Sequence, residues 1–231
     1  MKITITFVTL LLSLSVSAES CLYGISVCGV NEACIKTDKK IAQCISQPDI
    51  IPTVNFPLKA EAGIYCDQGN LSLEGNSHTF TNTAYALDLA SNRSASAGTA
   101  VAAADGLIIS YSKCTTINDQ CGNGFGNYIQ ILRDDGFLIF YAHLEKVFVR
   151  TGERVSIGQK IGFEGNSGWT GENNRHLHFS VHYNWKNISF ETLKKNVGWL
   201  PNSVPFKMNN LDSRDIKCSR VTGHLEWLSL P

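Results

Sequence analysis

The sequence predicts a mostly β protein, with an antiparallel β-sheet core and a small disulfide-rich N-terminal segment. Over residues 64–182, short runs of β-branched and aromatic residues alternate with clusters of Gly, Asn and Asp, and no helical period persists. Asp135 followed by Gly136 separates two of these runs and is a strong hairpin signal. The chain also has eight cysteines, and four of them lie within residues 21–44, a segment with few apolar side chains.

Residues 1–18 have the pattern of a signal peptide. Lys2 gives a positive start, an apolar run follows over residues 3–14, and V-S-A at 16–18 fits the small-residue rule for cleavage. The run is too short for a stable membrane span. We expect cleavage after Ala18 and export to the periplasm or the extracellular space. A lipoprotein would instead place Cys21 at the new N-terminus, but Glu19 stands where small residues are preferred.

Export places the cysteines in a compartment where disulfides persist. Residues 19–47 should form a Cys-rich segment held by disulfides, because so short a piece cannot bury much core. The order of pairing there cannot be read from the sequence. Cys114 and Cys121 flank a polar loop and should close it locally, whereas Cys66 and Cys218 are candidates, by elimination, for tying the ends of the β region together. No C-x-x-C pair occurs, which argues against a thiolate zinc site.

The rest of the chain divides by composition. Residues 48–75, with three prolines, suggest a linker or an edge segment that leads into the core. Residues 76–185 form the predicted core, with strands at 106–111, 128–132 and 138–142. Residues 186–231 should pack on that core, with a short helix at 190–196 and a strand at 203–208.

The charge balance excludes some partners. The chain has 20 basic and 20 acidic residues, and loss of the segment that contains Lys2 leaves a net charge of −1. This balance does not suggest a nucleic-acid binder. We expect no nucleic-acid partner, no stable membrane span and a monomer.

Residues 175–179 are the most informative for function. His176 and His178 alternate with Leu177 and Phe179, so in a strand the two imidazoles project from one face. A catalytic zinc takes three protein ligands, commonly His nitrogen and Asp or Glu oxygen, plus a water. It lowers the pKa of that water from about 15.7 to about 7. A neighbouring His can accept the proton or stabilise the developing oxyanion.

Each residue alone is a modest signal. Asp88 could be an ordinary turn cap, and His78 an ordinary loop residue. His182 and His224 are more simply explained as surface or core histidines than as ligands.

Six motifs together make the pattern specific. They resemble, in order, the motifs of lysostaphin-type zinc endopeptidases, the LytM-like murein hydrolases, and cover about half of the chain. They are G-T-A-V-A-A-A-D-G at 98–106, G-N-Y-I at 126–129, Y-A-H-L at 141–144, V-S-I-G-Q-K-I-G at 155–162, G-N-S-G at 165–168 and H-L-H-F at 176–179.

The resemblance implies a role for each position. The second His of H-x-H is a zinc ligand in the family, which here is His178. The Asp of a further family motif, which precedes these six, is also a ligand, and here it is Asp88 in Y-A-L-D-L at 85–89. The first His of H-x-H and the His of Y-A-H-L form the catalytic pair, which here are His176 and His143.

The chain departs from the common family pattern H-x-x-x-D, because Ala84 stands four residues before Asp88. Some family members place this ligand further upstream, and His78 resembles that arrangement. His78 is also the only histidine before His143. We therefore assign His78 as the third zinc ligand.

These assignments imply a zinc metalloendopeptidase that hydrolyses peptide bonds in the stems or cross-bridges of bacterial peptidoglycan. Two alternatives stay open. One is an inactive relative that binds or activates other wall hydrolases, for which Ala84 is the hint. The other is a secreted protease that acts on Gly-rich protein chains, in which residues 19–60 could cover the groove.

Overall fold

The computed structural model describes residues 32–36, 42–46, 49–61, 63–71, 78–92, 96–115, 120–171, 173–183, 188–196, 198–216 and 218. The predicted signal peptide, Cys21, Cys28 and His224 lie outside these residues. Among the helices of the described part, none is both long and apolar enough to cross a membrane.

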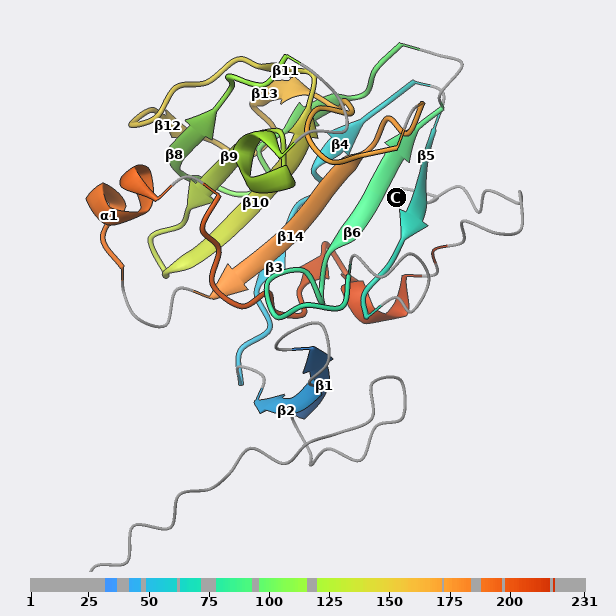
Figure 1. Ribbon diagram of the computed structural model, residues 1–231, viewed down its shortest axis with the longest axis vertical. Coiled ribbons are helices and arrows are strands. Elements are labelled where there is room, and N and C mark those ends of the chain that lie inside the picture. The colour runs from blue at the N-terminus through green and yellow to red at the C-terminus, as the bar shows by residue number, and fades with distance from the viewer. Residues whose placement is uncertain are drawn as a thin grey trace, which may run out of the picture.

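A seven-stranded sheet forms the centre of the molecule, and all its neighbouring strands are antiparallel. In Figure 1, β10, β14 and β6 lie side by side across its middle. In sheet order the strands are β12 (Arg154–Val155), β8 (Gly106–Tyr111), β9 (Asn127–Leu132), β10 (Phe137–Leu144), β14 (Leu177–Tyr183), β6 (Leu87–Ser91) and β5 (Ile64–Gln68).

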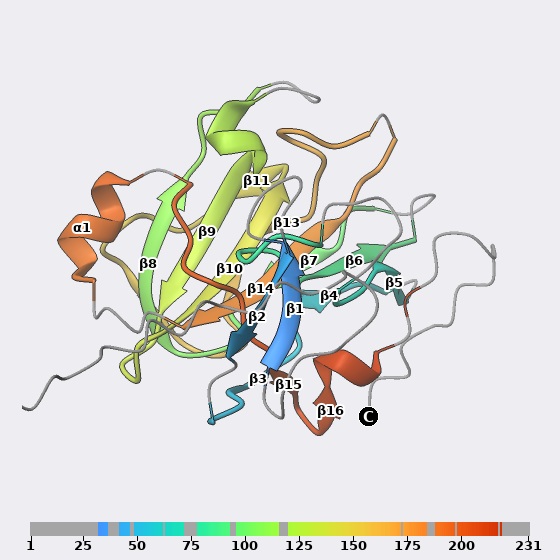
Figure 2. The same cartoon turned by 60° about the horizontal axis from the view of Figure 1, so that its bottom comes forward.

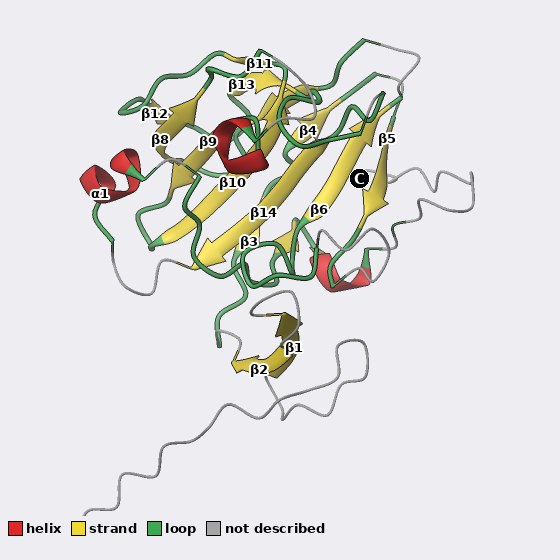
Figure 3. Cartoon of the chain, viewed as in Figure 1, coloured by secondary structure: helices red, strands yellow, loops and turns green. Residues whose placement is uncertain are grey.

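Three smaller sheets accompany the central one, and strands make up most of the ordered elements in Figure 3. The four-stranded sheet is antiparallel, whereas β3 runs parallel to β15 in the three-stranded sheet. The four-stranded sheet has the order β11 (Lys146–Val147), β13 (Lys160–Phe163), β7 (Thr99–Val101) and β4 (Leu58–Lys59), the three-stranded sheet has the order β16 (Leu211–Asp212), β15 (Lys207–Met208) and β3 (Thr53–Val54), and the hairpin pairs β1 (Glu32–Lys36) with β2 (Ala42–Ser46).

Alternation of side chains decides which face of the central sheet is apolar. Leu177, Phe179 and Val181 of β14 enter the main core, together with side chains from the four-stranded sheet such as Ala100 and Ile161. The residues that alternate with them along β14, including His178 and His182, are also buried and point to the opposite face of the sheet. The predicted separation of imidazoles from apolar side chains along this strand is therefore confirmed.

The turn between β9 and β10 is the hairpin that the sequence predicts. Arg133 N donates to Phe137 O at 2.9 Å, and Gly136 N donates to Arg133 O at 3.1 Å. Gly136 has φ +86°, a left-handed value at which glycine carries no Cβ clash.

Helices are few in the described part: α1 (Phe190–Lys195) and the short 3-10 helices η1 (Cys121–Gly124) and η2 (Ser213–Asp215). Ser189 caps α1 and accepts a hydrogen bond from Thr192 N. The strand expected at 203–208 is wrong for residues 203–206, because only Lys207 and Met208 form a regular strand. Pro205 has no N–H to donate to a ladder, and Ser203 makes an isolated bridge to His182 instead.

Two disulfides join described residues as the sequence suggests. Cys114 binds Cys121, and Cys66 binds Cys218 across 152 positions. In the N-terminal hairpin, Cys34 and Cys44 are both disulfide-bonded. The hairpin is seen from below in Figure 2. Its Ile35 is buried in a small apolar cluster with Ala84 and Tyr85 of the main body.

Candidate metal and catalytic site

Asp88 and His178 face each other across neighbouring strands. Asp88 on β6 is the register partner of His178 on antiparallel β14, and His178 Nδ1 lies 3.0 Å from Asp88 Oδ1. Both residues are buried, with 8% of Asp88 and 4% of His178 exposed. The pairing of the two strands therefore fixes two candidate ligands close to each other.

His78 reaches the same point from a turn that precedes β6. Its Nε2 lies 3.2 Å from Asp88 Oδ1 and 3.3 Å from His178 Nδ1. Its other ring nitrogen, Nδ1, donates to Gly69 O at 3.0 Å. This hydrogen bond fixes the tautomer in which Nε2 carries a lone pair, as is usual for a histidine that binds a metal. Ala84, the position of the missing common ligand, is buried beside Tyr85 instead.

The spacing of these three donors fits a tetrahedral zinc ion. With zinc–nitrogen and zinc–oxygen bonds of about 2.0–2.1 Å, two ligand atoms of a tetrahedron lie about 3.3 Å apart. The three separations here are 3.0, 3.2 and 3.3 Å. Among the described residues, His78, Asp88 and His178 are the His/Cys/Asp/Glu group that could hold a metal. One carboxylate and two imidazoles are also the donor types that zinc prefers.

The other two predicted residues, His143 and His176, lie beside this group. Their ring centroids are 4.8 Å apart, and His143 lies 5.9 Å from the His178 ring. His176 Nε2 is 3.8 Å from Asp88 Oδ1. The structure thus brings together all five residues that the sequence selects.

His143 occupies an irregular position on β10. The register against β9 shifts between Tyr141 and Leu144, and His143 has φ +61°. A non-glycine residue held in this left-handed region costs on the order of 1–3 kcal/mol and is often found at functional sites. Its backbone N donates to Phe125 O at 2.9 Å.

Two hydrogen bonds orient the imidazole rings of His143 and His176. His143 Nδ1 donates to Ser167 O at 2.9 Å, and His176 Nδ1 donates to Asn174 O at 2.7 Å. In both rings Nε2 is then the nitrogen that can accept a proton. Because both bonds go to backbone carbonyls, ring orientation depends on the loop over residues 165–174.

Burial and neighbouring charges shift the pKa values of Asp88, His78 and His143. Burial alone would raise the pKa of Asp88, but nearby His78 and His176 bring that pKa well below its usual range. Burial would lower the pKa of His78, yet Asp88 raises it above the usual histidine value. Burial lowers the pKa of His143 well below the usual value, and His176 and His178 lower it further. His143 is therefore neutral at neutral pH.

Close backbone packing explains two glycines of the family motifs. A Cβ on Gly126 would lie 2.2 Å from Ser167 O, and one on Gly168 would lie 2.3 Å from Gly126 N. The hydroxyl of Ser167 joins the same contact, since it accepts from Asn127 N at 2.9 Å and donates to Leu144 O at 2.8 Å. These contacts place Ser167 O beneath the His143 ring.

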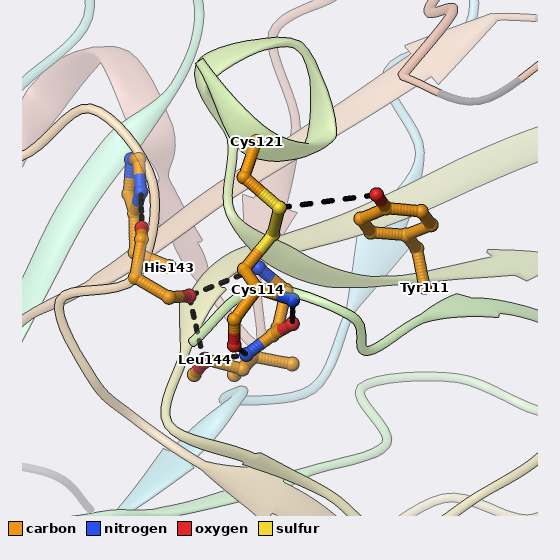
Figure 4. Close-up of a disulfide and its surroundings, with 7 residues drawn as sticks. Tyr111, Cys114, Cys121, His143 and Leu144 are labelled. Carbon is orange, nitrogen blue, oxygen red and sulfur yellow. Dashed lines mark hydrogen bonds between the residues drawn. A yellow bond between two sulfur atoms is a disulfide. The ribbon is translucent and has the colours of Figure 1, made fainter. Parts of the chain in front are cut away.

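A disulfide lies next to the backbone of His143 and Leu144. Figure 4 shows Cys114 and Cys121 between Tyr111 and the backbone of His143 and Leu144. The Asn127 side chain accepts from Cys114 N at 2.9 Å and donates to Leu144 O at 3.1 Å. The disulfide loop is thereby attached to the strand that carries His143.

We expect Gly126→Ala to destabilise the protein far more than Gly136→Ala. The first adds a Cβ against Ser167 O at φ +67° and should cost about 3 kcal/mol of unfolding free energy. The second has φ +86° but nothing within 4 Å, so only backbone strain of about 1 kcal/mol applies. Urea unfolding of both variants measures the difference. Equal losses would contradict the packing described for residues 126 and 167.

A buried carboxylate holds the strand ends near the site. Glu164 is fully buried and accepts from Ser91 N at 3.0 Å and Gly98 N at 2.9 Å, as well as from the Ser91 hydroxyl. Arg175 Nε lies 3.2 Å from Glu164 Oε1, and Arg175 Nη2 donates to Asn92 O at 2.9 Å. Arg175 precedes His176, and Ser91 ends the strand of Asp88. This network therefore fixes the two strands relative to each other.

Sequence reasoning did not assign roles to Ser167, Asn127 or Glu164. Ser167 and Asn127 stand inside quoted motifs, and their function becomes visible only when the loops meet. The sequence does contain a signal for Glu164: a single acidic residue directly after strand β13 (Lys160–Phe163) indicates a carboxylate that needs partners if it is buried. His182 is a buried core histidine with hydrogen bonds on both ring nitrogens, in agreement with its assignment.

Two histidines and an aspartate at metal-binding distance, with two further histidines beside them, form a donor arrangement of the kind that catalytic zinc sites use. Residues 83–190 match the family model described as Peptidase family M23. This stretch of the chain is therefore similar to an M23 peptidase domain, in agreement with the resemblance to lysostaphin-type peptidases that the sequence motifs indicate.

Similar proteins have more than one described role. The match to peptidoglycan DD-endopeptidase ShyA of Vibrio cholerae is 36% identical over 83 residues, which are 36% of this chain and 18% of that protein. The match to murein hydrolase activator NlpD of Salmonella dublin is 35% identical over 92 residues, 38% of this chain and 21% of that protein. The chain thus matches about a fifth of each relative's length. The catalytic domain of lysostaphin from Staphylococcus simulans has a TM-score of 0.38 and 26% identity, over 56% of this chain and 84% of that one.

Proposed function

We propose that this protein is an exported, zinc-dependent endopeptidase that hydrolyses peptide bonds in bacterial cell-wall peptidoglycan. The observation that carries the proposal is the convergence of His78 Nε2, Asp88 Oδ1 and His178 Nδ1 at 3.0–3.3 Å, beside His143 and His176. His78, Asp88 and His178 would hold the zinc ion. When bound, the ion would act as a Lewis acid and lower the pKa of a water molecule.

The remaining steps belong to the side chains of this chain. His143 Nε2 accepts a proton from the attacking water, because Nδ1 is engaged with Ser167 O and burial keeps the ring neutral. Once protonated, the ring can donate from Nε2 to the oxyanion of the tetrahedral intermediate and then transfer that proton to the leaving amine nitrogen as the C–N bond breaks. His176, oriented through Asn174 O, lies beside His143, with the two ring centroids 4.8 Å apart. The pair can therefore divide the roles of base and oxyanion partner.

A second candidate function is activation of another wall hydrolase. It is favoured by the match to a protein named murein hydrolase activator and by Ala84, which cannot bind metal. The arrangement of His78 weighs against this alternative, because an imidazole from another position supplies the third donor.

Digestion of purified peptidoglycan separates the two functions. We expect the wild-type protein alone to release soluble fragments, to stop when zinc is chelated, and to recover when zinc is added back. An activator would release nothing alone and would increase release by a second wall hydrolase. Cleavage of Gly-rich peptides without release from peptidoglycan would instead support the secreted-protease alternative.

A further inference from the structure

The third candidate ligand, His78, lies on a turn that precedes β6 and is not part of a regular strand of the central sheet. Within this turn, Ala84 N donates to Phe80 O at 2.7 Å and Ala86 N donates to Thr83 O at 2.9 Å. Residues 69–71, which follow β5, also hold the turn, because Leu71 N donates to Ala84 O at 2.6 Å and Asn70 Nδ2 donates to Ala86 O at 3.1 Å. None of these bonds attaches the turn to β14, the strand that carries His178. A ligand that must lie 3.3 Å from His178 Nδ1 needs support from outside the turn.

Ser203 supplies that support from the C-terminal part of the chain. Its backbone N donates to Thr81 O at 2.8 Å, and its hydroxyl donates to the same oxygen at 3.1 Å. The hydroxyl also accepts from Tyr85 N at 3.1 Å. Only 2% of Ser203 is exposed, so water does not compete well for these bonds.

Ser203 is in turn attached to the strand that carries His178. It forms an isolated antiparallel bridge with His182, and Val204 N donates to Val181 O at 2.8 Å. His182 Nδ1 donates to Pro201 O at 2.9 Å, while Ser180 Oγ donates to His182 Nε2 at 2.8 Å. A continuous hydrogen-bonded path thus runs from β14, through residues 201–204, to the turn of His78.

We propose that Ser203 is a positioning residue, which holds the 78–86 turn so that His78 Nε2 meets Asp88 and His178. The proposal rests on the proposed metal function. It gives the C-terminal segment a role that follows from Ala84: the third ligand comes from a turn, and Ser203 fixes that turn to β14. Ser203 itself contacts no candidate ligand, and it acts through the backbone of Thr81 and Tyr85.

The test compares Ser203→Ala with Ser213→Ala in the full chain. Ser213 is a matched control, because it is fully buried and its hydroxyl accepts from Phe206 N at 3.1 Å, in a different part of the C-terminal segment. Zinc affinity is measured by competition with a chelator, and ligand geometry by the visible spectrum of the cobalt-substituted protein. Urea unfolding of the metal-free proteins gives the stability of each variant.

We expect Ser203→Ala to lower zinc affinity about 10- to 100-fold and to alter the cobalt spectrum. Ser213→Ala should lose similar stability and keep both metal properties. Ser203→Thr retains the hydroxyl and should restore affinity. Should Ser203→Ala not fold, His182→Leu tests the same path, because it removes the donor to Pro201 O. His182→Asn keeps a donor near the position of Nδ1 and should bind zinc more tightly than the Leu variant.

The outcomes separate this proposal from the proposed function. Wild-type protein that binds no zinc would overturn both. Wild-type binding with unchanged affinity and spectrum in Ser203→Ala would overturn only the positioning role. Equal loss of zinc affinity in Ser203→Ala and Ser213→Ala would also overturn it, because the effect would then follow from general destabilisation.

Discussion

His178→Ala is expected to lose zinc and peptidase activity together. His178 Nδ1 lies 3.0 Å from Asp88 Oδ1 and 3.3 Å from His78 Nε2, at the centre of the donor group. Its removal leaves two ligands, fewer than the three that catalytic zinc sites use. Zinc content after dialysis should fall from about one ion per chain to near zero. Elemental analysis and fragment release from peptidoglycan measure the two losses.

Val181→Ala is the matched control for this variant. Val181 is a fully buried residue on the same strand, but its side chain enters the main core and not the site. The control should lose roughly 2–3 kcal/mol of unfolding free energy for the two buried methyl groups that it removes, and it should retain zinc. Full zinc content in His178→Ala would remove this residue from the ligand set.

His143→Ala should keep zinc and lose most of its turnover. The ring lies beside the donor group, with its centroid 5.9 Å from that of His178, and Nδ1 is engaged with Ser167 O. Loss of a general base or oxyanion partner typically reduces turnover about 100- to 10,000-fold. We therefore expect about one zinc ion per chain and a turnover lowered by at least 100-fold.

The two variants control for each other, because only one of them should release the metal. His143→Ala also relieves no left-handed strain, since alanine at φ +61° has the same Cβ clash. Near wild-type turnover in His143→Ala would overturn the assignment of this residue. Loss of zinc from it would instead make His143 a ligand.

The sequence allowed most of the fold to be predicted, because its signals are local. The strand expected at 106–111 is β8, and Asp135 and Gly136 lie in the turn between β9 and β10. The loop between Cys114 and Cys121 is short, so its closure could be inferred from spacing. Of the strand expected at 203–208, only Lys207 and Met208 are regular, because Pro205 lacks an N–H and Ser203 bonds to a distant turn, a contact that no local pattern reveals.

The site was predictable to the extent that its residues stand in strand patterns or motifs. The position of His178 follows from alternation in β14, and His176 stands directly before that strand, where it forms an isolated bridge with Gly165. The position of His78 could not be derived in this way, because His78 lies ten positions before Asp88 and the residues between them have no strand or helix pattern. Only the folded structure shows that Gly69 O and Ser203 bind this turn and orient it. No local sequence pattern marks a serine for such a role, because the residue that it binds, Tyr85, lies 118 positions away from Ser203.

The measurement that tests the central claim most directly is the zinc content of the purified wild-type protein and of His78→Ala, by elemental analysis. The account predicts about one zinc ion per wild-type chain and close to none in the variant. No zinc in the wild-type protein after reconstitution would contradict the account and make Ala84 the decisive residue, in favour of the activator function. Full zinc content in His78→Ala would show that the third ligand lies elsewhere.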